Sequence, residues 1–183
     1  PDNNQITIID AKELTKLNQF KSRSGNVPKA NGKCPFPEKR PRDHHKEFKW
    51  DAIRFANKVY AVFDAVTRTD DQWTVWIDAD TFVHSPISYE QFENLLPNDK
   101  WITYVGRGKG SQTWPECGFY GLNTHNQTCK RFLSEFERMY EDADNSIFKL
   151  DEWHDSFVFG KILNQLTPID KNFYDYSTGI YNK

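Results

Sequence analysis

The sequence predicts an α/β fold with an open mixed sheet flanked by helices, and three observations support this class. Short apolar runs at residues 73–77 and 101–105 have the length and the β-branched or aromatic content of strands. Amphipathic patterns with the period of a helix occur at residues 50–66 and 125–142. A length of 183 residues suits one domain with a sizeable core, so we expect a single domain over residues 1–183.

The N-terminal part of the chain predicts one strand and one long loop. A short β-branched run at residues 5–9 ends at Asp10 and has the composition of a strand. Residues 17–49 show little hydrophobic periodicity and include several prolines and a mixed basic segment, so we expect a long loop there. Loops of this length in compact domains are usually functional or disordered, and we expect this one to be mobile and near the ligand cleft.

Residues 50–66 predict an amphipathic helix that also carries a charged face. Asp51, Arg54 and Lys58 share this face at spacings of three and four residues. One interpretation is a ladder of ion pairs on a wet surface. The alternative is that Arg54 or Lys58 points into a cleft beside two carboxylates and offsets the charge of a phosphate. The apolar face recurs at i, i+3, i+4 and i+7 and consists of Ala52, Phe55, Ala56, Val59, Val62, Phe63 and Val66.

The run at residues 73–77 ends in two carboxylates separated by one residue, Asp78 and Asp80. Its apolar composition predicts a strand buried on both faces, and ligands of open α/β sheets bind beyond the carboxyl ends of the strands. Carboxylates at i and i+2 can converge on Mg²⁺ or Mn²⁺, which then bridges them to a diphosphate. A surface turn with two solvated aspartates is the alternative, and the lack of a glycine before Asp78 argues against it.

The middle of the chain predicts a further helix and two strands. A capping box of Ser88 and Gln91 indicates a short helix at residues 88–96. The loop at 106–110 has glycines on alternate positions but matches no phosphate-binding fingerprint, so we expect a mobile flap near the cleft. The other expected elements are strands at 101–105 and 116–123, the latter with close backbone approach at its glycines, and a helix at 125–142.

Five polar residues within 151–156 open an apolar helix that continues to Leu166. Either Asp155 or Ser156 is expected to cap this helix. His154 is a candidate ligand for a metal or a phosphate if the aspartate pair lies nearby. Because strand ends and helix starts gather at one edge of an open α/β sheet, we expect residues 153–155 to lie across a cleft from the aspartate pair.

The composition excludes some partners and favours others. A net charge of −2 with scattered Lys and Arg gives no support to nucleic-acid binding. An aromatic content of 15% suits a core of large side chains and also a sugar-binding cleft. No stretch approaches 18 apolar residues and no basic-then-apolar segment opens the chain, so we expect neither a membrane span nor a signal peptide. Three cysteines without metal-binding spacing favour reduced thiols and a cytoplasmic location.

The order of these motifs resembles that of nucleotide-sugar glycosyltransferases with the Rossmann-like GT-A fold. The similarity is to the retaining family that includes the blood-group A/B and α-1,3-galactosyltransferases, glycosyltransferase family 6, and it covers residues 50–166. The matching blocks are the helix with Arg54, then Asp78-Ala79-Asp80, Gly118-Phe119-Tyr120-Gly121 and Trp153-His154-Asp155.

This resemblance implies metal-dependent transfer of a hexose from a nucleoside-diphosphate sugar, expected to be a UDP-sugar, to a hydroxyl of a glycan or other acceptor, with retention. It implies that Asp80 binds Mn²⁺ or Mg²⁺ directly and that Asp78 binds the metal or the ribose of the donor. Arg54 would assist the diphosphate. Apart from the resemblance, Lys58 on the same helix face is a further candidate to offset the charge of the diphosphate. His154 and Asp155 would contact the donor sugar or the acceptor and are the catalytic candidates. The expected setting is the cytoplasm of a bacterial or viral system rather than the Golgi lumen.

The sequence departs from the family pattern at two points. The glutamate that follows Trp-His-Asp in the family is Ser156 here, which argues against double displacement at this position and leaves front-side substitution within an ion pair. The first strand-helix unit of a GT-A domain has no counterpart after Pro1, so we expect a chain that is short or truncated at its N-terminus.

Two alternative functions are an inactive sugar- or nucleotide-binding module of the same fold and a haloacid-dehalogenase-type phosphatase. In the phosphatase Asp78 would be the nucleophile, although Phe82 stands where Thr or Val is usual.

Overall fold

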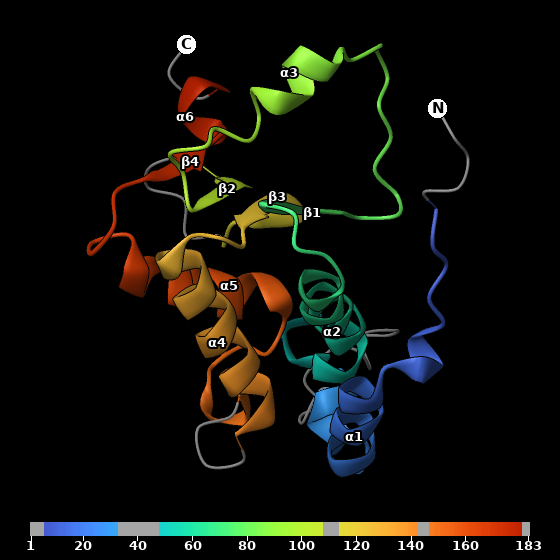
Figure 1. The fold of residues 1–183 in the computed structure, drawn as a ribbon. Coiled ribbons are helices and arrows are strands. Elements are labelled where there is room, and N and C mark those ends of the chain that lie inside the picture. Colours follow the sequence, from blue (N-terminus) through green and yellow to red (C-terminus); the bar gives the residue numbers. More distant parts are fainter. Residues whose placement is uncertain (1–5, 33–47, 108–113, 143–146, 181–183) are drawn as a thin grey trace.

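The computed structural model describes residues 6–32, 48–107, 114–142 and 147–180, which build an α/β fold around an open sheet of four strands (Figure 1). The strand order is β1-β3-β2-β4. β3 runs antiparallel to both of its neighbours, whereas β2 and β4 are parallel, so the predicted open mixed sheet is confirmed. The strands are β1 (Trp73–Ile77), β2 (Ile102–Val105), β3 (Glu116–Asn123) and β4 (Phe173–Asp175).

Helices lie on both sides of this sheet. Figure 1 shows α1, α2, α4 and α5 on one side and the short α3 and α6 on the other. α2 and α5 contact the strands directly, while α1 packs on α2 and α4 packs on α5. The helices are α1 (Thr15–Ser24), α2 (Ala52–Arg68), α3 (Tyr89–Glu93), α4 (Gln127–Glu141), α5 (Asp155–Leu166) and α6 (Ser177–Ile180).

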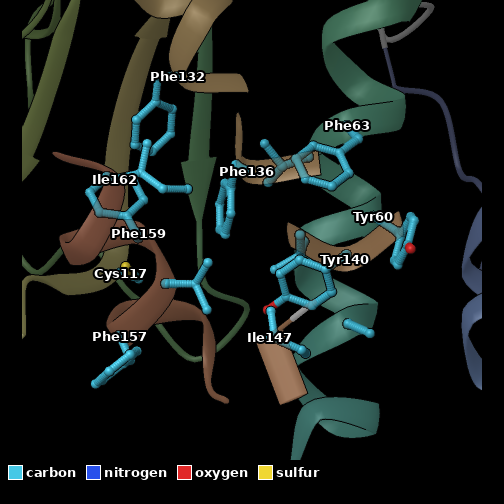
Figure 2. Close-up of a cluster of buried hydrophobic side chains, with 14 of the residues drawn as sticks. Tyr60, Phe63, Cys117, Phe132, Phe136, Tyr140, Ile147, Phe157, Phe159 and Ile162 are labelled. Carbon is cyan, nitrogen blue, oxygen red and sulfur yellow. The ribbon is translucent and has the colours of Figure 1, made fainter. Parts of the chain in front are cut away.

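An aromatic core fills the space between α2, α4 and α5. Phe136 of α4 lies between Phe63 of α2 and Phe159 of α5 (Figure 2), with ring centroids 5.5 and 6.2 Å away. Phe159 also packs on Phe132, at 5.0 Å. Edge-on aromatic pairs of this kind contribute about 0.5–1.5 kcal/mol each beyond the burial of their area. Much of the high aromatic content therefore serves the core.

Most predicted helices and strands are confirmed. The expected helices at 50–66, 88–96, 125–142 and the one ending at Leu166 appear as α2, α3, α4 and α5, and the expected strands at 101–105 and 116–123 appear as β2 and β3. The capping box also forms, because Ser88 Oγ accepts from the Gln91 N–H and Gln91 Oε1 accepts from the Ser88 N–H. Of the predicted flap at 106–110, residues 108–110 lie outside the described residues.

The aspartate-bearing strand is confirmed, but its predicted burial on both faces is wrong. β1 is the edge strand of the described sheet and pairs only with β3. Its first four residues are half-buried, and Ile77 is 48% exposed. An edge strand with one neighbour keeps part of its surface open, which the apolar composition alone does not reveal.

Two predictions for the N-terminal part are wrong. Residues 6–9 form no strand, and Ile8 is 92% exposed, because no described strand pairs with them. The predicted loop at 17–49 begins inside α1, where Leu17 and Phe20 are fully buried against the rest of the fold. Residues 33–47 of that segment lie outside the described residues. Three short 3₁₀ turns, Ala11–Glu13, Pro28–Asn31 and Phe48–Trp50, complete this region.

The two described cysteines are free thiols, as expected for reduced cysteines. Burial raises the pKa of Cys129 to about 12 and also raises the pKa of Cys117. Both thiols are therefore protonated and unreactive at neutral pH. No helix in the described part of the chain combines the length and the apolar character needed to cross a membrane.

Candidate functional site

One ammonium group joins the elements that the sequence analysis singled out. Lys58 Nζ of α2 lies 2.9 Å from Asp78 Oδ1 at the end of β1 and 3.0 Å from Asp155 Oδ2 at the start of α5. It also donates a hydrogen bond to the Cys117 carbonyl of β3. The expected approach of the Trp-His-Asp segment to the aspartate pair is thus confirmed for Asp155 and Asp78. The alternative for Lys58, that it points toward the carboxylates, is also confirmed.

The electrostatics of this cluster keep Lys58 charged. Burial of the side chain, which is 14% exposed, acts to lower the pKa of Lys58. The charge of Asp155 and the contact with Asp78 outweigh that effect, so the pKa is raised above its ordinary value. One ammonium faces two carboxylates, which leaves the ionised cluster with an excess negative charge.

Asp78 is held in place from several directions. Its backbone N–H donates to the Gly118 carbonyl at 2.8 Å, which continues the β1–β3 pairing, and its carbonyl accepts from the Thr81 N–H at 2.9 Å in a turn. Trp76 Nε1 donates to Asp78 Oδ1 at 2.6 Å. The same Oδ1 meets Lys58, so Oδ2 is the oxygen of Asp78 that remains for a ligand.

Asp80 is in a different situation from Asp78. Its side chain is exposed, and its carboxylate has no hydrogen-bond or ion-pair partner among the described residues. Within that part of the chain, no three Asp, Glu, His or Cys side chains group closely enough to hold a metal ion by themselves. Mg²⁺ usually takes one or two carboxylates and completes its shell with substrate phosphates and water. Asp78 and Asp80 therefore form no closed metal site by themselves, and a cation there would need further ligands such as those of a diphosphate.

His154 is the N-cap of α5, so the expectation that Asp155 or Ser156 caps this helix is wrong. Its Nδ1 accepts the Phe157 N–H at 3.3 Å, as a capping Asn or Asp oxygen would. Because Nδ1 accepts, Nε2 carries the proton and donates to Glu152 Oε2 at 2.9 Å. Both ring nitrogens are engaged within the chain, so in this structure His154 orients the segment and neither nitrogen is free for a metal or a phosphate.

Glu152 links His154 to Lys49, and neither Glu152 nor Lys49 was a candidate site residue in the sequence analysis. Glu152 Oε1 pairs with Lys49 Nζ at 2.9 Å while its other oxygen holds His154. Burial acts to raise the pKa of Glu152, but the hydrogen bonds from Lys49 and His154 outweigh it and lower the pKa. The signal in the sequence was the position of Glu152 two residues before His154; nothing local points to Lys49.

A cleft of about 380 Å³ lies beside Glu152, His154 and Asp155 and mixes aromatic with charged side chains. The His154 ring lies 5.4 Å from Phe48 and 5.8 Å from Phe55, measured between ring centroids, so these rings form one wall. Aromatic walls with a few polar groups suit the C–H faces and hydroxyls of a sugar. The lining residues are Phe48, Lys49, Phe55, Arg107, Trp114, Glu152, His154, Asp155 and Ser156.

Arg54 does not join the cluster. Its side chain is exposed, and its guanidinium lies 5.7 Å from the ring of its neighbour Phe55. The predicted ion-pair ladder is wrong as well, because Asp51 caps α2 by accepting the Arg54 N–H and Lys58 points to the carboxylates. Arg107, which lines the cleft, is a cation that the sequence analysis did not single out.

Comparisons of this chain with protein families, with curated proteins and with solved structures gave no match.

Proposed function

We propose that this chain is a metal-dependent glycosyltransferase of the GT-A fold. It moves a hexose from a nucleoside-diphosphate sugar, with UDP as the expected carrier, to the hydroxyl of a glycan or other acceptor, with retention. The observation that carries the proposal is the Lys58 bridge. It brings Asp78 at the end of β1 and Asp155 at the start of α5 to one point beside an aromatic cleft.

The donor's diphosphate belongs at the end of β1 in this proposal. Asp80 and Asp78 Oδ2 would hold Mn²⁺ or Mg²⁺, which offsets the charge that develops on the departing diphosphate. Lys58 adds a positive charge beside this point, because its raised pKa keeps it protonated. Arg54 lies outside the cluster, so its proposed role is limited to the exposed rim near the nucleotide.

The sugar belongs in the cleft, where Asp155 and the aromatic wall lie. Asp155 is buried and lines the cleft, with its Oδ2 facing Lys58. In this proposal its carboxylate stabilises positive charge on the anomeric carbon of the reacting sugar. His154, fixed by Glu152, holds the start of α5 and with it the position of Asp155. Ser156 offers no carboxylate, so front-side substitution within an ion pair is the mechanism that fits these residues.

An inactive sugar- or nucleotide-binding module of the same fold is the second candidate. The observation in its favour is that Asp78 Oδ1 and both nitrogens of His154 already have partners within the chain. Such a module would use the cleft and the exposed Asp80 without turnover.

Nucleotide release from a panel of sugar nucleotides with Mn²⁺ and simple acceptors separates these functions. Release of UDP that is abolished in Asp155→Asn and strongly reduced in Asp80→Asn supports the transferase. Binding without release supports the module. Release of inorganic phosphate would indicate a phosphatase and contradict both.

A further inference from the structure

We infer that Lys58 competes with the divalent cation for Asp78 and transfers to Asp155 when the cation binds. The inference rests on the proposed function and assigns Lys58 a specific part in it. In the metal-free chain the ammonium lies on Oδ1 of the carboxylate whose other oxygen the cation would use. Binding of metal with a nucleotide diphosphate then moves Lys58 fully onto its other partners.

The starting position follows from the contacts of Asp78. Lys58 Nζ lies 2.9 Å from Oδ1, and the Trp76 N–H occupies the same oxygen. The ammonium also lies 5.6 Å from the Trp76 ring, within reach of a cation–π attraction. A divalent ion on Asp78 would sit close to this ammonium, and two cations at that range repel each other. Metal and Lys58 therefore oppose each other at Asp78.

The carboxylate to which Lys58 would move, that of Asp155, is buried and can accept a further hydrogen bond. Asp155 is 4% exposed, and its Oδ2 lies 3.0 Å from Lys58 Nζ, yet Oδ2 makes no hydrogen bond among the described residues. A buried acceptor without a hydrogen bond is costly. A small movement of the ammonium away from Asp78 would supply that bond while the Cys117 carbonyl keeps its own. Asp155 thus provides a ready second partner.

Lysine is chemically suited to such a transfer. Its ammonium is a point charge with three donors on a flexible four-carbon stem, so it can change partners without movement of α2. An arginine would hold Asp78 with a rigid, permanently charged fork. The expected consequence is that the cation alone binds weakly, and that a diphosphate, which brings negative charge, makes its binding favourable. Lys58 would in this way couple metal binding to nucleotide binding.

Mn²⁺ binding without nucleotide, followed by calorimetry or electron paramagnetic resonance, tests the inference. The main variant is Lys58→Met/Asp155→Asn, which removes the competitor and leaves the net charge of the cluster unchanged. We expect this variant to bind Mn²⁺ about tenfold more tightly or better, and to gain less from added UDP than the wild-type chain does. Lys58→Arg should bind Mn²⁺ more weakly. Lys49→Met, which alters the Glu152 pair alone, should match the wild type.

Several outcomes would overturn the inference. Equal or weaker Mn²⁺ binding in the double variant would show that Lys58 does not compete. If that variant fails to fold, as judged by circular dichroism, Lys58→Arg carries the test, and unchanged or tighter binding there would contradict the inference. If Mn²⁺ binds to no chain, with or without UDP, the proposed metal site itself is wrong. If Mn²⁺ binds the wild type and the position-58 variants equally well, the inference about Lys58 is wrong but the proposed metal site stands.

Discussion

At the scale of single residues, the site depends on how one ammonium is shared between a half-exposed and a buried carboxylate. Asp155 is the more demanding partner, because a buried carboxylate without a counter-charge is strongly unfavourable. Asp78 has other support from Trp76 and the backbone of Gly118. Loss of Lys58 should therefore cost more free energy at Asp155 than at Asp78.

Replacing Lys58 with Met should destabilise the fold by about 3–5 kcal/mol at neutral pH, the usual cost of breaking a buried ion pair. The pKa of Lys58 is raised in the folded chain, so its contribution is fully present below the ordinary value of 10.5. It is lost as the pH rises through the higher folded value. Urea unfolding should show a constant difference between wild type and variant from pH 7 to about 10, which then narrows.

The matched control is Lys49→Met, since the Lys49–Glu152 pair is more exposed. Exposed pairs contribute about 0–1 kcal/mol, so its effect on the unfolding free energy should be small. A Lys58→Met effect no larger than that of the control would show that the Lys58 cluster does not stabilise the fold.

Single-residue roles could be predicted only in part. The strand that ends in Asp78 and the helix start at Asp155 were visible in the sequence, and their meeting followed from α/β geometry. The capping role of His154 was missed because Asp and Ser are the more frequent caps. Lys49 was missed because 103 residues separate it from Glu152.

At the scale of elements, α5 places the catalytic candidate through its cap. Removing the cap in His154→Ala should cost about 1 kcal/mol of stability, whereas His154→Asn keeps an accepting oxygen near the Phe157 N–H and should retain most of it. Both variants lose the Glu152 contact, so the difference between them isolates the cap. Thermal unfolding measures it. Equal melting temperatures for the two would mean that the cap contributes little.

β3 offers a second test, because its two glycines face different surroundings. A Cβ at Gly121 would lie 2.7 Å from both Leu96 Cδ2 and Thr103 Oγ1, whereas one at Gly118 would find its nearest atom, Asp78 Oδ2, at 3.5 Å. Gly121→Ala should therefore destabilise the chain by about 1–3 kcal/mol through overpacking. Gly118→Ala is the control and should change the unfolding free energy little. A larger loss of unfolding free energy in Gly118→Ala than in Gly121→Ala would contradict this packing of β3.

The elements that could be predicted are those with many apolar residues at regular spacing. α2 and α4 carry long apolar stripes, and both were predicted within a few residues. α1 was missed because its burial depends chiefly on Leu17 and Phe20 within a polar sequence, and contact with α2 stabilises it. Residues 6–9 have the composition of a strand, but a strand needs a partner that no local pattern can supply.

At the scale of the whole molecule, one strand of the sheet and two helices from the same side of the sheet meet at the candidate site. α2 provides Lys58, the sheet provides Asp78, and α5 provides Asp155, so a ligand bound there contacts elements that pack around the common core. A ligand that binds only the folded chain stabilises all of these elements together, by about 2.7 kcal/mol at a concentration of 100 times its Kd. For a chain of this length, that free energy corresponds to a rise in melting temperature of roughly 5–10 °C.

In the proposed site, Asp80 and Asp78 Oδ2 would supply only part of a metal shell, so UDP and Mn²⁺ together should raise the melting temperature by far more than the sum of their separate effects. A chelator should abolish the joint effect, and so should Asp80→Asn, whose exposed side chain makes a change in the stability of the free chain small. Asp99→Asn is the matched control, since Asp99 is also exposed but pairs with Lys100 outside the cluster. An equal shift with UDP in the presence and absence of chelator would show that nucleotide binds without metal. The assignment of Asp80 as a metal ligand would then fail, whatever activity the chain retains.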